Sequence, residues 1–240
     1  MALKWLFFDL DDTLYDFTQS SLVSLRKLWD EEELIKTKYD DPESFIDEYH
    51  KHNALMWERH ERGEITAEYL KMERFRLTLA PDKHDEDTET AMRGLNRRYL
   101  EHLGESDLTC PGAQELLASL HGKYMMGILT NGFTEVQYKK LRSTGLWRHI
   151  QRMVISDEIG IQKPDPRLFH FAEEAVGAKA DEIMIIGDNP DNDVAGALQA
   201  GWRAVYYDRK MRGERAFDSK GFQGRITDLR ELNEILRAQN

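Results

Sequence analysis

Two carboxylates stand directly after a short apolar run near the start of the chain. Residues 4–8 read Lys-Trp-Leu-Phe-Phe, and residues 9–14 read Asp-Leu-Asp-Asp-Thr-Leu. A buried strand that ends in one carboxylate, two residues before another, is costly unless something nearby needs the negative charge. The alternative is an ordinary turn in which Asp11, Asp12 and Thr13 only cap a following helix. The strand context favours a chemical role for the pair.

Three later stretches carry groups that could work with this acidic pair. They are residues 129–132 (Leu-Thr-Asn-Gly), 162–166 (Gln-Lys-Pro-Asp-Pro) and 187–193 (Gly-Asp-Asn-Pro-Asp-Asn-Asp). Together they offer a hydroxyl, an ammonium group and further carboxylates. Such a set suits hydrolysis of a phosphate ester, which needs a positioned nucleophile, neutralised charge and a proton for the leaving alkoxide. An aspartate can be that nucleophile when a cation shields it, and an aspartyl-phosphate then forms.

The chain after Thr109 contains the elements that would position these groups. Short apolar runs alternate with amphipathic helices, which predicts a parallel sheet with right-handed crossovers and helices on both faces. The expected strands are 4–8, 124–129, 152–156, 183–186 and 204–207, and the expected helices are 133–144, 165–176, 191–200 and a last one opened by a capping box of Asp228 and Glu231.

Parallel sheets of this kind bind ligands beyond the carboxyl ends of their strands, at the point where the strand order reverses. Asp9, Thr130 and Asp188 each stand where an expected strand ends. Lys163 lies in the loop after the third strand. We therefore expect groups that are scattered along the sequence to meet at one edge of one sheet.

The segment from about residue 16 to residue 104 is highly charged and helical in pattern, with no convincing strand. One helix is expected to begin at the segment 41–43 (Asp-Pro-Glu), and Thr66 is a good N-cap for the next. Gly104 is expected to end the last helix in a left-handed conformation.

The expected domains are an α/β core and a helical insertion. The core comprises residues 1–14 and 110–240, and the insertion comprises residues 15–109. Because the insertion follows the first strand directly, it can fold back over the carboxyl edge of the sheet as a lid.

Taken in order, the four stretches resemble the four motifs of the haloacid dehalogenase (HAD) superfamily, most of whose members are magnesium-dependent phosphatases. The resemblance implies a doubly wound parallel sheet with a Rossmann-like core and a helical cap domain inserted after the first strand. It assigns Asp9 as the nucleophile and Asp11 as the general acid for the leaving group and then the base for water. It also implies that the backbone carbonyl of Asp11 binds the metal.

The expected cofactor is Mg²⁺, which prefers oxygen ligands and often uses only one or two carboxylates of the protein. Asp9 and Asp188 fit that demand. Asp193, five residues after Asp188, matches the family's spacing and is expected to act just outside the ligands or through a water. The acidic run 188–193 could instead complement a helix dipole, but that does not explain Asp188 at the strand end.

Phosphate binding is assigned to Thr130, Asn131 and Lys163. The hydroxyl of Thr130 and the amides of Asn131 and Gly132 form a small anion-binding nest beside a helix start. A lone threonine here would more often be a simple cap, and a lone lysine before proline would usually be a surface residue. In this sequence Lys163 supplies the positive charge that the carboxylates and a phosphate together require.

Two other functions are open to this superfamily fold. A dehalogenase uses the same aspartate to displace halide from a 2-haloacid, but it needs neither a proton donor nor a metal. Asp11 and Asp188 would then be superfluous, so phosphatase chemistry is preferred. A non-enzymatic binding module would be favoured if a motif were missing, and all four are present.

The substrate is suggested by a narrower resemblance, to the branch that dephosphorylates pyrimidine nucleoside monophosphates, including noncanonical ones. It rests on residues 61–66 with Arg74-Phe75 in the lid, and on residues 129–137 in the core. The lid aromatics Trp29, Trp57 and Phe75 could stack on a base, although aromatics at helical spacing more often form a core. The alternative is a small sugar-phosphate or phosphoglycolate-type phosphatase.

Composition limits the partners. The chain has 240 residues and a formal net charge of -11, which argues against nucleic acid as a ligand. Its one cysteine, Cys110, precedes a Pro-Gly turn and is a poor candidate nucleophile. The first apolar run is too short to span a membrane. We expect a cytoplasmic protein whose partner is a small phosphate ester, and the oligomeric state is left open.

Overall fold

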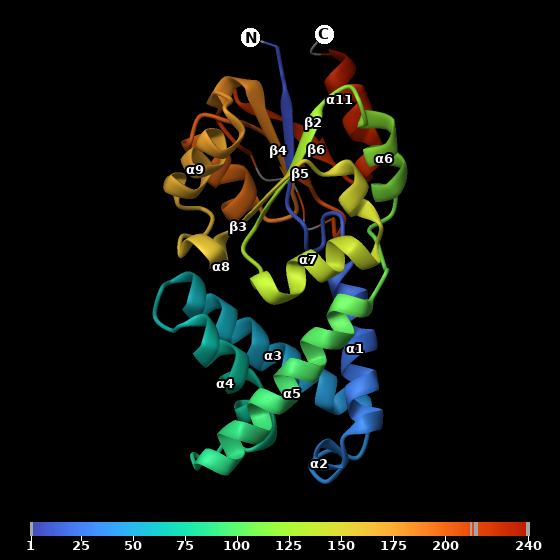
Figure 1. Ribbon diagram of the computed structural model, residues 1–240, viewed down its shortest axis with the longest axis vertical. Helices are drawn as coiled ribbons and strands as arrows, with labels where there is room; N and C mark the ends of the chain where they lie inside the picture. The colour runs from blue at the N-terminus through green and yellow to red at the C-terminus, as the bar shows by residue number, and fades with distance from the viewer. Residues whose placement is uncertain (1, 212, 214–215, 239–240) are drawn as a thin grey trace. The chain divides into compact units, whose positions relative to one another are not determined.

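The computed structural model describes residues 2–211, 213 and 216–238. The chain forms two compact units, shown in Figure 1. The α/β unit consists of Met1–Phe17 and Asp107–Asn240, and the helical unit consists of Thr18–Ser106. Among the described residues, no helix is both long and apolar enough to cross a membrane.

The α/β unit is built on one parallel sheet, which has six strands in the described part of the chain. Its spatial order is β3-β2-β1-β4-β5-β6. The strands are β1 (Trp5–Phe8), β2 (Met125–Thr130), β3 (Arg152–Ile155), β4 (Ile183–Gly187), β5 (Arg203–Tyr207) and β6 (Phe222–Ile226). The order reverses between β1 and β4, so the predicted doubly wound topology is confirmed. Ligands of such sheets bind beyond the carboxyl ends of the strands at this point of reversal.

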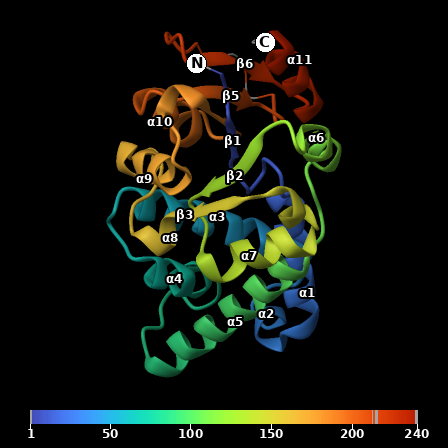
Figure 2. The ribbon, with the colours of Figure 1, turned by 45° about the horizontal axis from the view of Figure 1, so that its top comes forward.

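Successive side chains of a strand point to opposite faces of the sheet, and here both faces are buried. Leu6 and Phe8 pack into one core together with Leu116, while Phe7 packs into the other with Phe169. The helices of this unit are α6 (Ala113–Leu120), α7 (Thr134–Ser143), α8 (Ser156–Ile159), α9 (Pro166–Val176), α10 (Gly196–Gln199) and α11 (Leu232–Ala238). Figure 2 shows α9 and α10 on one side of the sheet and α6 and α11 on the other.

Two features of this unit differ from expectation. Strand β6 is not predicted, because its five residues are mostly half-buried and include Gly224 at φ +143°. The helix expected over 191–200 begins instead as a π-helical turn, Pro190–Ala195, before α10. The capping box of Asp228 and Glu231 is confirmed, and it opens a short 3-10 turn, Leu229–Glu231, that leads into α11.

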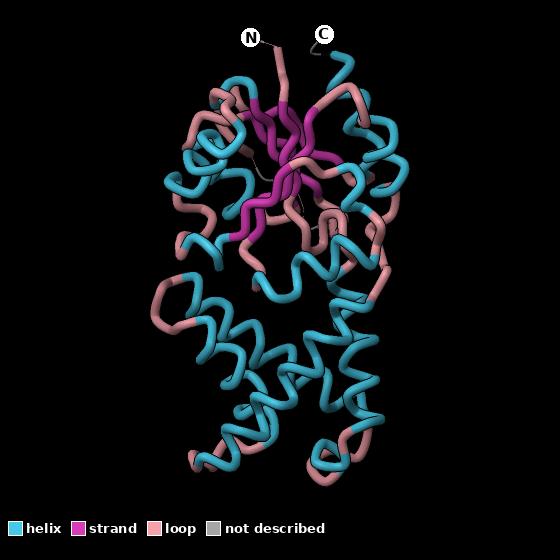
Figure 3. The backbone as a smooth tube through the Cα atoms, viewed as in Figure 1, coloured by secondary structure: helices cyan, strands magenta, loops and turns pink. Residues whose placement is uncertain are grey.

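The helical unit contains no strand within residues 18–106, all of which the structure describes (Figure 3). Its helices are α1 (Phe17–Glu31), α2 (Glu33–Lys36), α3 (Pro42–Glu61), α4 (Ala67–Leu79) and α5 (Glu86–Glu105). Thr66 caps α4 as predicted, since its hydroxyl accepts the amide of Tyr69. The expectation for Gly104 is wrong: it lies inside α5, and the extended residue Ser106 ends the helix.

Arg74 lies in the core of the helical unit with 2% of its surface exposed. Its guanidinium donates to Asn53 Oδ1 at 2.9 Å and to Asn96 Oδ1 at 2.5 Å. It also lies within 6 Å of the ring centroids of Tyr49, Phe75 and Tyr99. The buried guanidinium therefore joins three helices, and Arg74 belongs to the core of the helical unit.

We expect Arg74→Ala to lower the stability of the protein by about 2–5 kcal/mol, because it removes the donor to the buried amide oxygen of Asn96 and to the part-buried one of Asn53, and it opens a cavity among aromatic rings. Arg93→Ala is the matched control on α5, where the side chain is 52% exposed, and it should change stability by less than about 0.5 kcal/mol. Urea unfolding of both variants measures the difference. Equal stabilities would show that the buried contacts of Arg74 contribute nothing.

Candidate active site

Three strand ends bring the predicted residues together. Asp9 follows β1, Thr130 ends β2 and Asp188 follows β4, and β1 is paired with both of its neighbours. The amide of Asp9 continues the β1–β4 ladder by donating to the carbonyl of Ile186 at 2.9 Å. The structure therefore places Asp9 centrally, buried, with Thr130 on one side and Asp188 on the other.

Lys163 reaches into the same place from the loop between α8 and α9. Its ammonium group donates to Asp9 Oδ1 at 2.7 Å, to Asp193 Oδ1 at 2.5 Å and to the carbonyl of Leu129 at 2.7 Å. The side chain of Asn131 holds the backbone of this lysine, because its Nδ2 donates to the Lys163 carbonyl and its Oδ1 accepts the Lys163 amide. Asn131 thus positions Lys163, a contact that sequence reasoning did not foresee.

The electrostatics of the pair follow from burial. Burial raises the pKa of Asp9 well above its ordinary value; Lys163 lowers that pKa, and the carboxylates of Asp193, Asp188 and Asp11 raise it further. Burial alone would lower the pKa of Lys163, but Asp193 and Asp9 outweigh it and raise that pKa above its ordinary value. Lys163 is therefore a cation, and it is not enough to balance the negative charge around Asp9.

Asp9, Asp188 and Asp193 form an acidic cluster in which one carboxylate oxygen of each lies within 4.8 Å of the others. Asp193 also accepts the amide of Asn189 at 2.9 Å. Its approach depends on Gly187, since a Cβ added there would lie 2.2 Å from Asp193 Oδ2. Oxygen ligands in this arrangement suit a hard divalent cation such as Mg²⁺.

Asp11 is held by two residues of α7 that the sequence analysis did not single out. Lys140 Nζ donates to Asp11 Oδ1 at 2.7 Å, and Gln137 Nε2 donates to Asp11 Oδ2 at 3.1 Å. Gln137 Nε2 also donates to Thr130 Oγ1 at 2.7 Å. The amide of Gly132, expected to face the substrate, instead donates to Thr130 Oγ1 at 3.2 Å.

A charge count supports the fit to a divalent metal. Four carboxylates, those of Asp9, Asp11, Asp188 and Asp193, meet two ammonium groups, those of Lys163 and Lys140. With all four carboxyl groups ionised, these six side chains leave two formal negative charges. One Mg²⁺ would neutralise them, so the residues present fit the expected cofactor.

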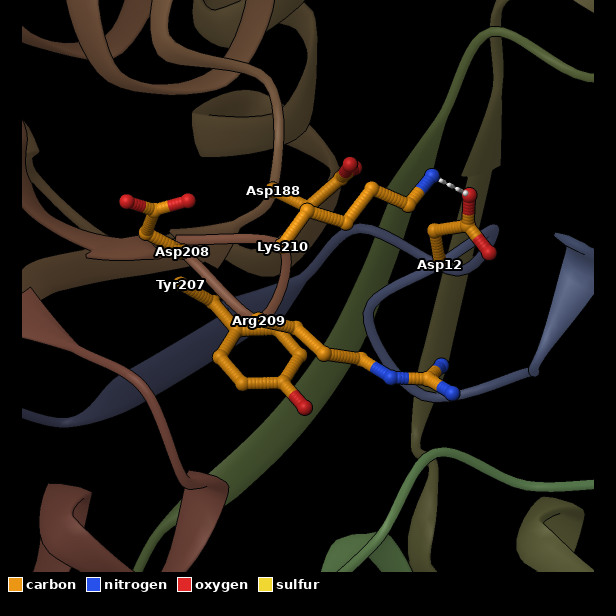
Figure 4. Close-up of a pocket in the computed structure, with 6 residues that line it drawn as sticks. All are labelled: Asp12, Asp188, Tyr207, Asp208, Arg209 and Lys210. Atoms are coloured by element: carbon orange, nitrogen blue, oxygen red, sulfur yellow. Dashed lines mark hydrogen bonds and ion pairs between the residues drawn. The ribbon is translucent and has the colours of Figure 1, made fainter. Parts of the chain in front are cut away.

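Beyond Asp188, the loop after β5 closes a small pocket that Figure 4 shows. Lys210 in this loop pairs with Asp12 across the pocket, with 2.7 Å between Nζ and Oδ2. Asp12 has a left-handed backbone, φ +57°, at the turn after Asp11. Asp12 therefore lies in the turn itself, and its carboxylate is paired with Lys210.

Cys110 contacts Arg209 of this loop and has 1% of its surface exposed. Its sulfur accepts a hydrogen bond from the guanidinium of Arg209 at 3.3 Å. Burial raises the pKa of the Cys110 thiol to about 12 despite that guanidinium. The structure therefore agrees with the prediction that Cys110 is no nucleophile.

Because the reactive species of cysteine is the thiolate, we expect native Cys110 to resist a disulfide-exchange reagent at pH 8. The same thiol should react fully once the protein is unfolded in guanidinium chloride. The released chromophore measures both reactions on one sample. Rapid stoichiometric labelling of the native protein would contradict this burial.

The comparisons with known proteins place the chain in a family. The family model of the haloacid dehalogenase-like hydrolases matches residues 3–201. The chain belongs to that family of enzymes, as the four motifs predicted. It is 30% identical to the pyrimidine 5'-nucleotidase YjjG of Escherichia coli strain K12, over 98% of this chain and 99% of that protein. It is also 30% identical to the pyrimidine 5'-nucleotidase PynA of Streptococcus pneumoniae, over 86% of this chain and 84% of that protein.

The fold agrees with a solved relative. The crystal structure of the HAD hydrolase YfnB from Bacillus subtilis, bound to magnesium, superposes with a TM-score of 0.82. The two chains are 26% identical, and the match covers 98% of this chain and 99% of that one. The predicted fold class is thereby confirmed.

Proposed function

We propose that this hydrolase is a magnesium-dependent phosphatase that works through an aspartyl-phosphate on Asp9. The proposal rests mainly on one observation, the pairing of the acidic cluster around Asp9 with a second carboxylate, Asp11, two residues later. The cluster suits a metal that binds phosphate, and Asp11 suits proton transfer to an alkoxide. Displacement of halide would use neither.

In the first step, a carboxylate oxygen of Asp9 attacks phosphorus, and the bond from phosphorus to the ester oxygen breaks. Asp11 in its acid form gives its proton to that departing oxygen. Lys163, which contacts Asp9 directly, neutralises charge that the phosphoryl group brings into the site. The product alcohol leaves, and Asp9 carries the phosphoryl group.

In the second step, Asp11 is the base. It takes a proton from water as the water oxygen attacks phosphorus, and the bond between phosphorus and the Asp9 oxygen breaks. Inorganic phosphate leaves, with Asp9 restored as a carboxylate and Asp11 restored in its acid form. Thr130 supports both steps, since its hydroxyl accepts from Gln137 and keeps its own proton to donate to a phosphoryl oxygen.

Asp9, Asp188 and the backbone carbonyl of Asp11 would hold the Mg²⁺ ion, with Asp193 beside them. When bound, the ion supplies charge neutralisation for the phosphoryl group and for Asp9. Asp193 also contacts Lys163 directly, so this carboxylate orients the lysine as well as lying beside the metal ligands.

For the substrate, we propose nucleoside monophosphates, in particular pyrimidine nucleotides. Support comes from the names of two relatives, YjjG and PynA, and from the resemblance of residues 61–66 and 129–137 to that branch. The helical segment 15–109 is proposed as the lid that selects the substrate. Within it, Trp57 is half-buried, while Phe75 is fully buried and belongs to the core of the helical unit.

The test is phosphate release from a panel of nucleoside monophosphates, small sugar phosphates and phosphoglycolate, with magnesium present. We expect the highest kcat/KM for a pyrimidine nucleotide. A higher value for a sugar phosphate would replace the substrate assignment and leave the chemistry intact. Release of halide from a 2-haloacid, without any phosphate release, would overturn the function itself.

Trp57→Ala should change the ratio of kcat/KM between a pyrimidine nucleotide and a sugar phosphate by about 10-fold, because a lost aromatic contact with a base is worth about 1–3 kcal/mol. Hydrolysis of an activated aryl phosphate should change much less. Specificity constants for the same substrate pair on wild type and variant measure this. If all substrates fall by one common factor, the lid does not select by this residue.

A further inference from the structure

A buried lysine beside the candidate active site has no part in the chemistry described so far. Lys140 lies on α7, its side chain is 3% exposed, and its ammonium group pairs with Asp11 at 2.7 Å. The Asp11 side chain is 28% exposed. A lysine is rarely buried unless a partner requires its charge, so the burial of Lys140 beside Asp11 calls for an explanation.

The contacts around Asp11 involve both of its carboxylate oxygens. Lys140 binds Oδ1, and Gln137 binds Oδ2. Residues 137 and 140 are three apart on one helix and therefore share a face. The same Gln137 amide group also binds Thr130, so a single helix connects the proposed proton donor to a proposed phosphate ligand.

The local sequence makes room for these contacts. Gly132 lies between Thr130 and the start of α7, and a Cβ added there would lie 2.2 Å from Gln137 Nε2. The ammonium group of Lys140 also faces two aromatic rings, since its Nζ lies 5.1 Å from the ring centroids of Tyr15 and Phe17. The rings keep water away from the ammonium group and favour its charge, so Lys140 is confined to the neighbourhood of Asp11.

A proton donor needs such support. The carboxyl group of an aspartate rotates in a broad well about its last torsion, so an unsupported carboxyl samples many orientations. Transfer requires the donor oxygen about 2.6–3.2 Å from the leaving oxygen, and a displacement of about 1 Å can lower the rate about 10²-fold. Each Asp11 oxygen has two lone pairs. When Lys140 or Gln137 donates to one of them, the other can still hold the proton that is transferred.

We propose that Lys140, with Gln137, is a positioning residue that holds the carboxyl group of Asp11 in the orientation in which it protonates the leaving group. The inference rests on the proposed phosphatase function. The inference adds that the dependence of hydrolysis on Lys140 varies with the leaving group of the ester. An ester whose alkoxide needs a proton depends on Lys140, and one whose leaving group departs as a stable anion does not.

The experiment compares kcat/KM for a nucleoside monophosphate and for dinitrophenyl phosphate. Lys140→Met should lower the first by about 10²-fold and the second by less than about 5-fold, because a correctly placed acid contributes about 10²–10⁴-fold only where a proton is needed. Lys139→Met is the matched control, since it removes the same charge from an exposed neighbour on α7. It should leave both values within about 2-fold of wild type.

Two further variants separate positioning from a merely structural role. Lys140→Arg keeps a cation at this place and should restore most of the lost ratio between the two esters. Gln137→Leu should split the two esters in the same direction, by about 10-fold. If Lys140→Met does not fold, as judged by circular dichroism, the split in Gln137→Leu decides.

Equal losses for both esters in the deciding variant would overturn the inference, and so would no loss for either. A failure of the proposed function gives a different result, because the wild-type protein would then release no phosphate from any ester. Asp11→Asn completes the series. It should show the same split as Lys140→Met, and a common loss factor in that variant would remove Asp11 from the role that Lys140 is proposed to support.

Discussion

Asp9→Asn is expected to lower kcat for phosphate release by at least about 10⁴-fold, since loss of a nucleophile leaves only binding and electrostatic assistance. The amide neither attacks phosphorus nor offers a charged oxygen to the metal. Phosphate release at saturating magnesium, on a nucleotide and on an activated ester, measures the loss. Both substrates should fall together, because both need the nucleophile.

The control for this variant is its stability. The pKa of Asp9 is raised in the folded protein, so the folded state binds this proton more tightly than the unfolded state does. At a pH above its folded pKa, such a carboxyl group is ionised while buried, and this lowers the stability of the folded state. A neutral asparagine should therefore leave the melting temperature at or above that of wild type at pH 7 without metal. A folded Asp9→Asn protein with wild-type activity would refute the mechanism.

Removal of divalent metal is expected to have the second largest effect. Chelation should lower kcat/KM by about 10³-fold, because a bound cation contributes several kcal/mol of charge stabilisation at a phosphoryl group. Without it, Asp9, Asp188 and Asp193 carry their charges within one cluster against a single lysine, Lys163. Adding Mg²⁺ back after chelation should restore the full rate.

Binding of the metal has a second readout that does not depend on activity. A ligand that binds only the folded state raises the melting temperature. Mg²⁺ should raise it for wild type and raise it less for Asp188→Asn, which loses one proposed ligand. Halide release from a haloacid with no metal present, and no phosphatase activity, would instead establish the dehalogenase alternative.

The sequence was sufficient to predict which strand ends meet, because each one carries its own local signal. An apolar run followed at once by Asp9 or Asp188 marks both the strand and the place where it stops. The parallel topology then brings these ends together without further information. For the same reason, Thr130 was found at the end of β2.

Contacts that depend on tertiary packing were not predictable in this way. Lys140 stands beside Lys139, and such a pair is typical of a solvated helix face. Only the path of α7 shows that one of the two lysines is buried against Asp11. The hydrogen bond from Asn131 to the backbone of Lys163 also depends on tertiary packing, since it joins residues 32 positions apart.

Arg74 is a further residue whose place depends on tertiary packing. Its position in the resemblance to the nucleotidase branch suggested a part in substrate selection, but a charged residue amid aromatics at helical spacing can equally lie in a core. The structure gives it amide partners and three rings inside the helical unit. Local pattern alone could not decide between the two, because both place the same residue types on the same helix.

The central claim is that Asp9 carries the phosphoryl group during turnover. It is tested most directly by mixing excess enzyme with substrate and magnesium, quenching within one turnover in acid, and locating the added phosphoryl mass by peptide mass spectrometry. We predict a phosphoryl group on the peptide that contains Asp9, labile to hydroxylamine as an acyl phosphate should be, and absent from Asp9→Asn. A protein that turns over its substrate with the phosphoryl group on another residue, or on none at any quench time, would contradict the account.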